Sequence, residues 1–208
     1  MRRVHNWGWP AFGVLAIGAG SAAAGIAYDN ITGKAGKSVL VSSDDEFADD
    51  TTLNASAGLT ITAVRARLYN ASNQPYTGEL RFWIYGAGAG QPGSLLGSSV
   101  APIKLAAQSE GTFEVPFANL TVPSAALWTG WQIPVVGPQA QVGVMLDANP
   151  SVGSSTALQA RHYPDTTWGI SNIPDSNFMF QIVTVPAPAS ATALGVLALG
   201  AVGARRRR

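Results

Sequence analysis

Residues 25–184 alternate repeatedly between apolar and polar side chains, and no stretch among them has a long apolar period of 3.6 residues. A period of two residues is typical of strands that bury one face. The clearest case is residues 79–85, where we expect Leu80, Phe82 and Ile84 to point inward. This alternation restricts the chain to an all-β fold.

Further stretches show the same alternation. In residues 59–69 the apolar set changes phase near Ala63, which predicts a β-bulge. Pro116 lies within another alternating stretch and predicts an edge strand. The expected inward sets are Phe113, Val115 and Phe117; Val142, Val144 and Leu146; Leu158, Ala160 and His162; and Phe178, Phe180 and Ile182. Eight to ten short strands separated by Gly, Pro and Asn predict a single β-sandwich or jelly-roll domain.

Nearly half of the basic residues lie at the two ends of the chain. It has 13 Lys+Arg, 12 Asp+Glu and no cysteine. Six of the arginines lie in residues 1–24 and 185–208, so the central 160 residues carry a net charge near −5. A protein that neutralises phosphates needs a basic face, so this balance argues against a nucleic-acid partner.

The N-terminal segment has the layout of a secretory signal. Arg2 and Arg3 precede an apolar stretch at residues 7–20, and small residues follow. We expect a signal helix in residues 1–24 and cleavage by signal peptidase near Ala24 or Ala27. The alternative is a retained membrane anchor, for which the apolar stretch is short.

The C-terminal segment combines prolines, an apolar run and a basic end. Residues 189–204 form an apolar run of 16 residues, where a spanning helix needs about 20. The chain then ends in Arg205, Arg206, Arg207 and Arg208, which would stop it in the membrane on the cytoplasmic side. A short apolar helix that holds the chain transiently fits this length better than an ordinary tail anchor.

This tail resembles the PEP-CTERM sorting signal of Gram-negative bacteria. The motif positions are Val185, Pro186, Ala187 and Pro188, a Val-Pro-x-Pro-Ala variant with Ala187 in place of the usual Glu. The resemblance implies export across the inner membrane, transient membrane association and processing by an exosortase-type enzyme. It also implies a final location at the cell surface or outside the cell, with a link to exopolysaccharide and biofilm.

The central part is also similar to a group of β-sandwich domains found in PEP-CTERM proteins. The similarity is carried by residues 28–30, 46–50, 81–85 and 91–96. We therefore expect a signal peptide at 1–24, a β-sandwich domain at 25–184 and a sorting signal at 185–208. The group implies a fold rather than an activity.

One acidic cluster is a candidate metal site. Carboxylate oxygens are the ligands that calcium prefers, and its residues are Asp44, Asp45, Glu46, Asp49 and Asp50. The spacing does not match an EF-hand loop, and the competing interpretation is a solvated acidic loop with Phe47 in the core.

Aromatic side chains suggest a second kind of site. Trp83 and Tyr85 should point outward from their strand, and Trp168 lies near a turn. Exposed rings stack on sugar faces, so these residues are candidates for carbohydrate binding. The competing interpretation is that a second sheet covers Trp83 and Tyr85.

The sequence favours a structural or adhesive protein over an enzyme. The only histidine of the central part is His162, which we interpret as a core or loop residue. No serine lies in a Gly-x-Ser-x-Gly elbow. A hydrolase would need two carboxylates to meet, with candidates Glu79, Glu110, Glu114 and Asp147. Ice binding is a further alternative, but there is no regular Thr-x-Thr array.

Overall fold

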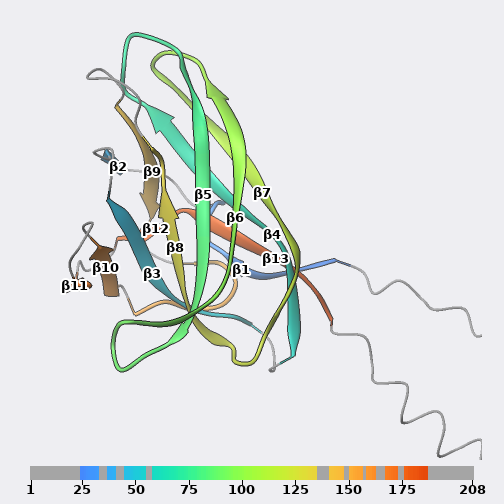
Figure 1. Cartoon of the computed structure of the whole chain (residues 1–208). Helices are drawn as coiled ribbons and strands as arrows, with labels where there is room; N and C mark the ends of the chain where they lie inside the picture. The colour runs from blue at the N-terminus through green and yellow to red at the C-terminus, as the bar shows by residue number, and fades with distance from the viewer. Residues whose placement is uncertain are drawn as a thin grey trace, which may run out of the picture.

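The computed structural model describes residues 24–32, 37–40, 45–54, 58–134, 141–147, 150–156, 158–162, 167–172 and 176–186. These residues form thirteen strands and no helix (Figure 1). The strands are β1 (Gly25–Asp29), β2 (Lys37–Leu40), β3 (Glu46–Thr52), β4 (Leu59–Asn70), β5 (Tyr76–Ala87), β6 (Pro92–Leu105), β7 (Ser109–Val122), β8 (Ala126–Gln132), β9 (Val142–Asp147), β10 (Leu158–His162), β11 (Gly169–Asn172), β12 (Asn177–Phe178) and β13 (Phe180–Pro186). The signal helix and the apolar helix were expected at residues outside these ranges.

The strands form two antiparallel sheets. Sheet A has the order β1-β13-β4-β9-β12, with β2 also paired to β9 and β7 to β4. Sheet B has the order β11-β10-β3-β8-β5-β6. The all-β prediction is confirmed, and the strand number exceeds the eight to ten expected because β2, β11 and β12 have only two to four residues.

One main core lies between the sheets. Leu80, Phe82 and Ile84 of β5 are fully buried in it, as their alternation predicted. Phe178 and Phe180 contribute from sheet A and are equally buried. Burying an aromatic side chain contributes about 2–3 kcal/mol, so this shared core holds the two sheets together.

The predicted irregularities occur where expected. The register of β4 against β7 shifts between Ile61 and Ala63, which confirms the bulge. β7 pairs with β4 alone among the described strands, which confirms the edge position that Pro116 indicated. This edge lies against β6, since the Ser99 hydroxyl donates to the Pro116 carbonyl across the gap between the sheets.

Three local expectations are wrong. Leu158, Ala160 and His162 have the predicted alternation but face away from the main core, and Ala160 belongs to a small cluster on the outer side of sheet B. Arg161 determines which side of β10 faces the core. Its guanidinium lies over the Phe47 ring at 5.3 Å, on the side of β10 opposite to Leu158, Ala160 and His162.

The second wrong expectation is that residues 86–93 form a glycine-rich loop in which Pro92 and Gly93 make a turn. They begin β6 rather than form the turn, because Gly90, with φ of 73°, adopts the left-handed conformation there. The third is the acidic loop at residues 46–50, which is strand β3 with Asp49 fully buried, although Phe47 packs against the core as expected.

Candidate functional site

The acidic cluster is divided by the alternation of β3. Asp44 lies outside the described residues. Asp45 is buried and accepts a hydrogen bond from the Arg161 guanidinium in an ion pair. Glu46 points to the outer side of sheet B, whereas Asp49 has the same parity as Phe47 and points toward the main core. The five acidic residues therefore do not form one site.

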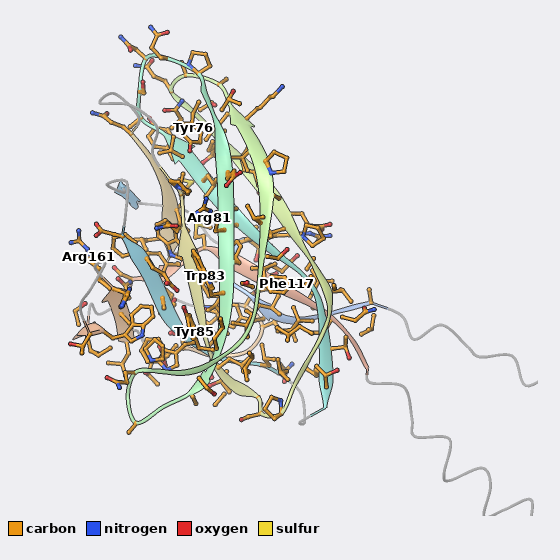
Figure 2. The ribbon with its side chains drawn as sticks, in the orientation of Figure 1. Tyr76, Arg81, Trp83, Tyr85, Phe117 and Arg161 are labelled. Atoms are coloured by element: carbon orange, nitrogen blue, oxygen red, sulfur yellow. The ribbon has the colours of Figure 1, made fainter. Side chains whose placement is uncertain are left out.

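The outer side of sheet B carries an aromatic surface. Trp83 and Tyr85 occupy alternate positions of β5 (Figure 2). Their side chains lie on the side of the strand opposite to its core residues. Trp168 precedes β11, and its ring meets that of Tyr85 edge-to-face with centroids 5.7 Å apart. We call this surface the aromatic face and define it by Trp83, Tyr85 and Trp168, with Glu46 and His162 beside them. Sheet A covers the other side of β5, so the interpretation that a second sheet covers Trp83 and Tyr85 is wrong.

A small apolar cluster lies between the aromatic face and the backbone of sheet B. Ala48, Trp128 and Ala160 are buried on the same side of sheet B, and Tyr85 and Trp168 pack against them. Ala48 of β3 pairs with Ala160 of β10 on one side and with Gly130 of β8 on the other. A row of small residues leaves space above the sheet, which the large rings of neighbouring strands fill.

Glu46 and Tyr85 form a half-buried pair within this face. The Tyr85 hydroxyl donates to Glu46 Oε1 at 2.7 Å. A Cβ on Gly130 would lie 2.5 Å from Glu46 Oε1 and 3.1 Å from Tyr85 Cε2, so the pair occupies the space that a larger residue would need. Burial raises the pKa of Glu46 from 4.5 to about 7, against the opposing effect of the Tyr85 hydrogen bond.

His162 lies at the border of the same face. It is half-buried, and its ring lies 5.1 Å from that of Trp168. It is neither a core residue nor in a loop, because it forms the last position of β10 and pairs with Glu46. The pairing of His162 with Glu46 could not be predicted from the sequence, because it joins strands more than 100 residues apart.

Polar groups extend the aromatic face along β5. Arg81 lies two residues before Trp83 on the same side of the strand (Figure 2). Its guanidinium donates to Glu79 Oε2 at 3.0 Å and to Gln132 Oε1 at 3.4 Å. Planar hydrogen-bonding groups next to aromatic rings are the combination that orients a bound polar ligand.

A second polar group is buried near the ends of β3 and β12. Asp49 accepts a hydrogen bond from the Phe178 amide at 3.0 Å, and Asp50 accepts one from the Ser155 hydroxyl at 2.8 Å. Burial, and next the charge of Asp50, hold the pKa of Asp49 well above its ordinary value. Ser155 and its neighbours were not predicted, because nothing in the sequence shows that residues 150–156 return to β3.

The described residues contain no group of three His, Cys, Asp or Glu side chains that could hold a metal ion. The carboxylates considered for hydrolysis are spread over both sheets: Glu110 and Glu114 pair with Arg67 and Arg65 on sheet A, and Glu79 lies on sheet B. Asp147 ends β9 in sheet A.

The expected sorting motif begins within a strand. Val185 and Pro186 pair with Thr60 and Leu59 as the last residues of β13. Ala187, Pro188 and Arg205 to Arg208 lie outside the described residues. No helix within the described ranges is long and apolar enough to cross a bilayer.

Compared with models of known protein families and with curated protein sequences, the chain matches none of them.

Proposed function

We propose that this chain is an exported protein of the cell surface or extracellular matrix, with a structural or adhesive and non-catalytic role. In this proposal it contacts exopolysaccharide through the aromatic face. The single observation that carries it is the position of Trp83, Tyr85 and Trp168 on one side of one sheet, with Glu46 and Arg81 beside them. Sugar rings present an apolar face and a polar rim, which this combination complements.

Export and sorting are proposed from the two terminal segments. Signal peptidase removes residues 1–24, the apolar run holds the chain transiently in the inner membrane, and an exosortase-type enzyme cuts near the proline motif. The proposal also includes a jelly-roll type of sandwich for the two sheets and a short apolar helix for the run at 189–204. The described part supports it in one respect: Gly25 at the start of β1 pairs with Thr184 near the end of β13, so both terminal segments attach at the same end of sheet A.

Carbohydrate binding is tested by the retention of the purified full chain on immobilised matrix polysaccharides. We expect Trp83→Ala and Trp168→Ala each to weaken binding about tenfold, since a stacking ring is worth at least about 1.4 kcal/mol. Tyr69→Ala is a matched control, because Tyr69 is also half-buried but lies on sheet A. Equal binding by all three variants, or no binding by the unmodified chain, would refute the assignment of the aromatic face.

Sorting is tested by a pulse-chase experiment with an epitope tag at the C-terminus. We expect the tag to be lost as the protein matures, and to be kept in cells that lack the processing enzyme. A mature surface protein that retains its tag would contradict the sorting route and leave the carbohydrate test unaffected.

A further inference from the structure

Exposed apolar side chains are concentrated on sheet B. Within the described residues, the large aliphatic side chains that solvent reaches most are Ile26, Leu95, Val100 and Ile170, each 40–53% exposed. Three of these four belong to sheet B, and Ile26 belongs to sheet A. Single exposed apolar residues are common on protein surfaces, whereas a group of them on one surface marks a site of interaction.

Strand pairing places two of these side chains beside the aromatic face. Leu95 pairs with Tyr85, and Val100 pairs with Arg81. Directly paired residues of antiparallel strands have their side chains on the same side of the sheet. Ala101, the neighbour of Val100, packs in the main core, so Val100 points outward. β6, which lies next to β5 at the end of sheet B, therefore adds two aliphatic side chains beside the aromatic face (Figure 1).

The third aliphatic side chain lies at the other end of the same sheet. Ile170 of β11 pairs with Ala160, which is buried in the small apolar cluster on the outer side of sheet B. Ile170 therefore points to the outer side too, two positions after Trp168. Apolar side chains are thus present on this side from β11 to β6, a width of about 24 Å at the ordinary spacing of neighbouring strands.

The charges beside Trp83 balance one another. Arg81 lies two positions before Trp83, and its guanidinium forms an ion pair with Glu79 at 3.0 Å. Lys104, the cation of β6, pairs with Thr77, which lies about 20 Å along β5 from Trp83. A ligand with acidic groups is bound most strongly by cations that have no carboxylate partner. The paired donors and acceptors beside Trp83 suit an uncharged ligand instead, since sugar hydroxyls both donate and accept hydrogen bonds.

We propose that the ligand of the aromatic face is an uncharged polysaccharide in an aggregated, insoluble form, which contacts Leu95 and Val100 as well as the rings. This inference rests on the proposed carbohydrate binding and adds the class of ligand to it. Polysaccharide chains that pack side by side present a broad apolar surface of sugar-ring faces, whereas one dissolved chain presents a narrow strip. Only the broad surface covers rings on β5 and aliphatic side chains on neighbouring strands at once, and the free energy gained grows with the apolar area that is covered.

The experiment measures how far microcrystalline cellulose and chitin, both uncharged and insoluble, deplete the purified full chain from solution. The competitors are hydroxyethylcellulose and glycol chitin, which are soluble derivatives of the same polysaccharides, and alginate, which is acidic. We expect binding to at least one of the two insoluble polysaccharides. An excess of its soluble derivative or of alginate should displace little of the bound protein.

Two variants test the contact with β6. Leu95→Ala and Val100→Thr should each weaken binding to the insoluble polysaccharide about threefold, because each removes part of a half-exposed apolar contact. Both positions are exposed, so stability should hardly change, which urea denaturation checks. The matched control is Ile26→Ala, since Ile26 has a similar exposure of 47% but lies on β1 of sheet A, and this variant should bind as the unmodified chain does.

The outcomes separate this inference from the proposed function. Displacement by alginate or by the soluble derivative, with binding still lost in Trp83→Ala, would overturn the inference and leave carbohydrate binding by the aromatic face in place. Full binding by both Leu95→Ala and Val100→Thr, or an equal loss in Ile26→Ala, would refute the contact with β6. No binding to either insoluble polysaccharide would overturn the inference as well, and retention on matrix polysaccharides would then decide the proposed function separately.

Discussion

Glu46→Gln should stabilise the protein at neutral and alkaline pH and have almost no effect in acid. The Glu46 carboxyl is half-buried under the aromatic face, and burial raises its pKa from 4.5 to about 7. The folded protein therefore binds more protons than the unfolded chain between these pH values, so the contribution of this group is fully present below pH 4.5 and is lost as pH rises through about 7. Glutamine keeps an oxygen that can accept from the Tyr85 hydroxyl but carries no charge.

The magnitude follows from the size of this pKa shift. For a carboxyl group fully shielded from solvent, a pKa shift from 4.5 to about 7 would correspond to about 3.4 kcal/mol of stability, at about 1.36 kcal/mol per pKa unit. Glu46 retains solvent contact on one side, so we reduce this to about 1–2 kcal/mol. We expect the variant and the unmodified chain to have equal free energies of unfolding near pH 4, and the variant to be more stable by about 1–2 kcal/mol at pH 8.

The assay is urea denaturation of the full chain, followed by tryptophan fluorescence at several pH values between 4 and 8. Only the difference between variant and unmodified chain is interpreted, because it removes the titration of all other groups. Glu79→Gln is the control, an exposed carboxylate on β5 that should show no such trend. A stability difference for Glu46→Gln that is constant across this range, or that favours the unmodified chain at high pH, would refute the argument.

Three further outcomes are expected. Gly130→Ala places a methyl group against the Glu46 carboxyl and should turn this side chain toward solvent, which NMR titration would detect as a fall of its pKa from about 7 toward 4.5; an unchanged pKa would mean that the pair tolerates the methyl group. Phe82→Ala should lower the free energy of unfolding, measured by urea denaturation, by about 3–5 kcal/mol. In the same assay Leu95→Ala, at an exposed residue, should change it by less than about 0.5 kcal/mol. Similar losses of stability for the two variants would contradict the position of the core. N-terminal sequencing of the exported protein should find cleavage after Ala24, because cleavage after Ala27 would remove three of the five residues of β1. A mature chain that starts at residue 28 would show that these three residues are dispensable.

The sequence predicted the parts of the fold that depend on local periodicity. The inward set of β5, the bulge of β4 and the edge position of β7 follow from which side chains are apolar and where proline stands. The face to which β10 turns was predicted wrongly, since alternation defines two sides of a strand without saying which side meets the other sheet. That choice is made by Arg161, whose guanidinium packs over Phe47 and pairs with Asp45.

For the candidate sites too, the sequence predicted what depends on alternation within one strand and not what depends on how strands pair. Trp83 and Tyr85 lie on one face, as expected, because the alternation of β5 is regular. The contact of Tyr85 with Glu46 and Trp168 depends on strand order instead. The acidic stretch was taken as one group of ligands, but a strand sends adjacent side chains to opposite sides. The hydrogen-bond partners of Asp49 and Asp50 at residues 155, 156 and 178 lie more than 100 residues away, so spacing along the sequence could not indicate them.

The last strand also determines how far the folded part can stand from a bilayer. β13 is hydrogen-bonded through Pro186, and the apolar run begins at Ala189, so two residues separate them. Two residues extend to at most about 7 Å. Under the proposed sorting route, the newly exported protein therefore has a very short linker to the membrane. The end of sheet A where β1 begins and β13 ends then lies close to the lipid headgroups. The processing enzyme must cut the chain between this end of the sheet and the membrane surface. Release would then free the domain to rotate and diffuse, and with it the sheet that bears the aromatic face.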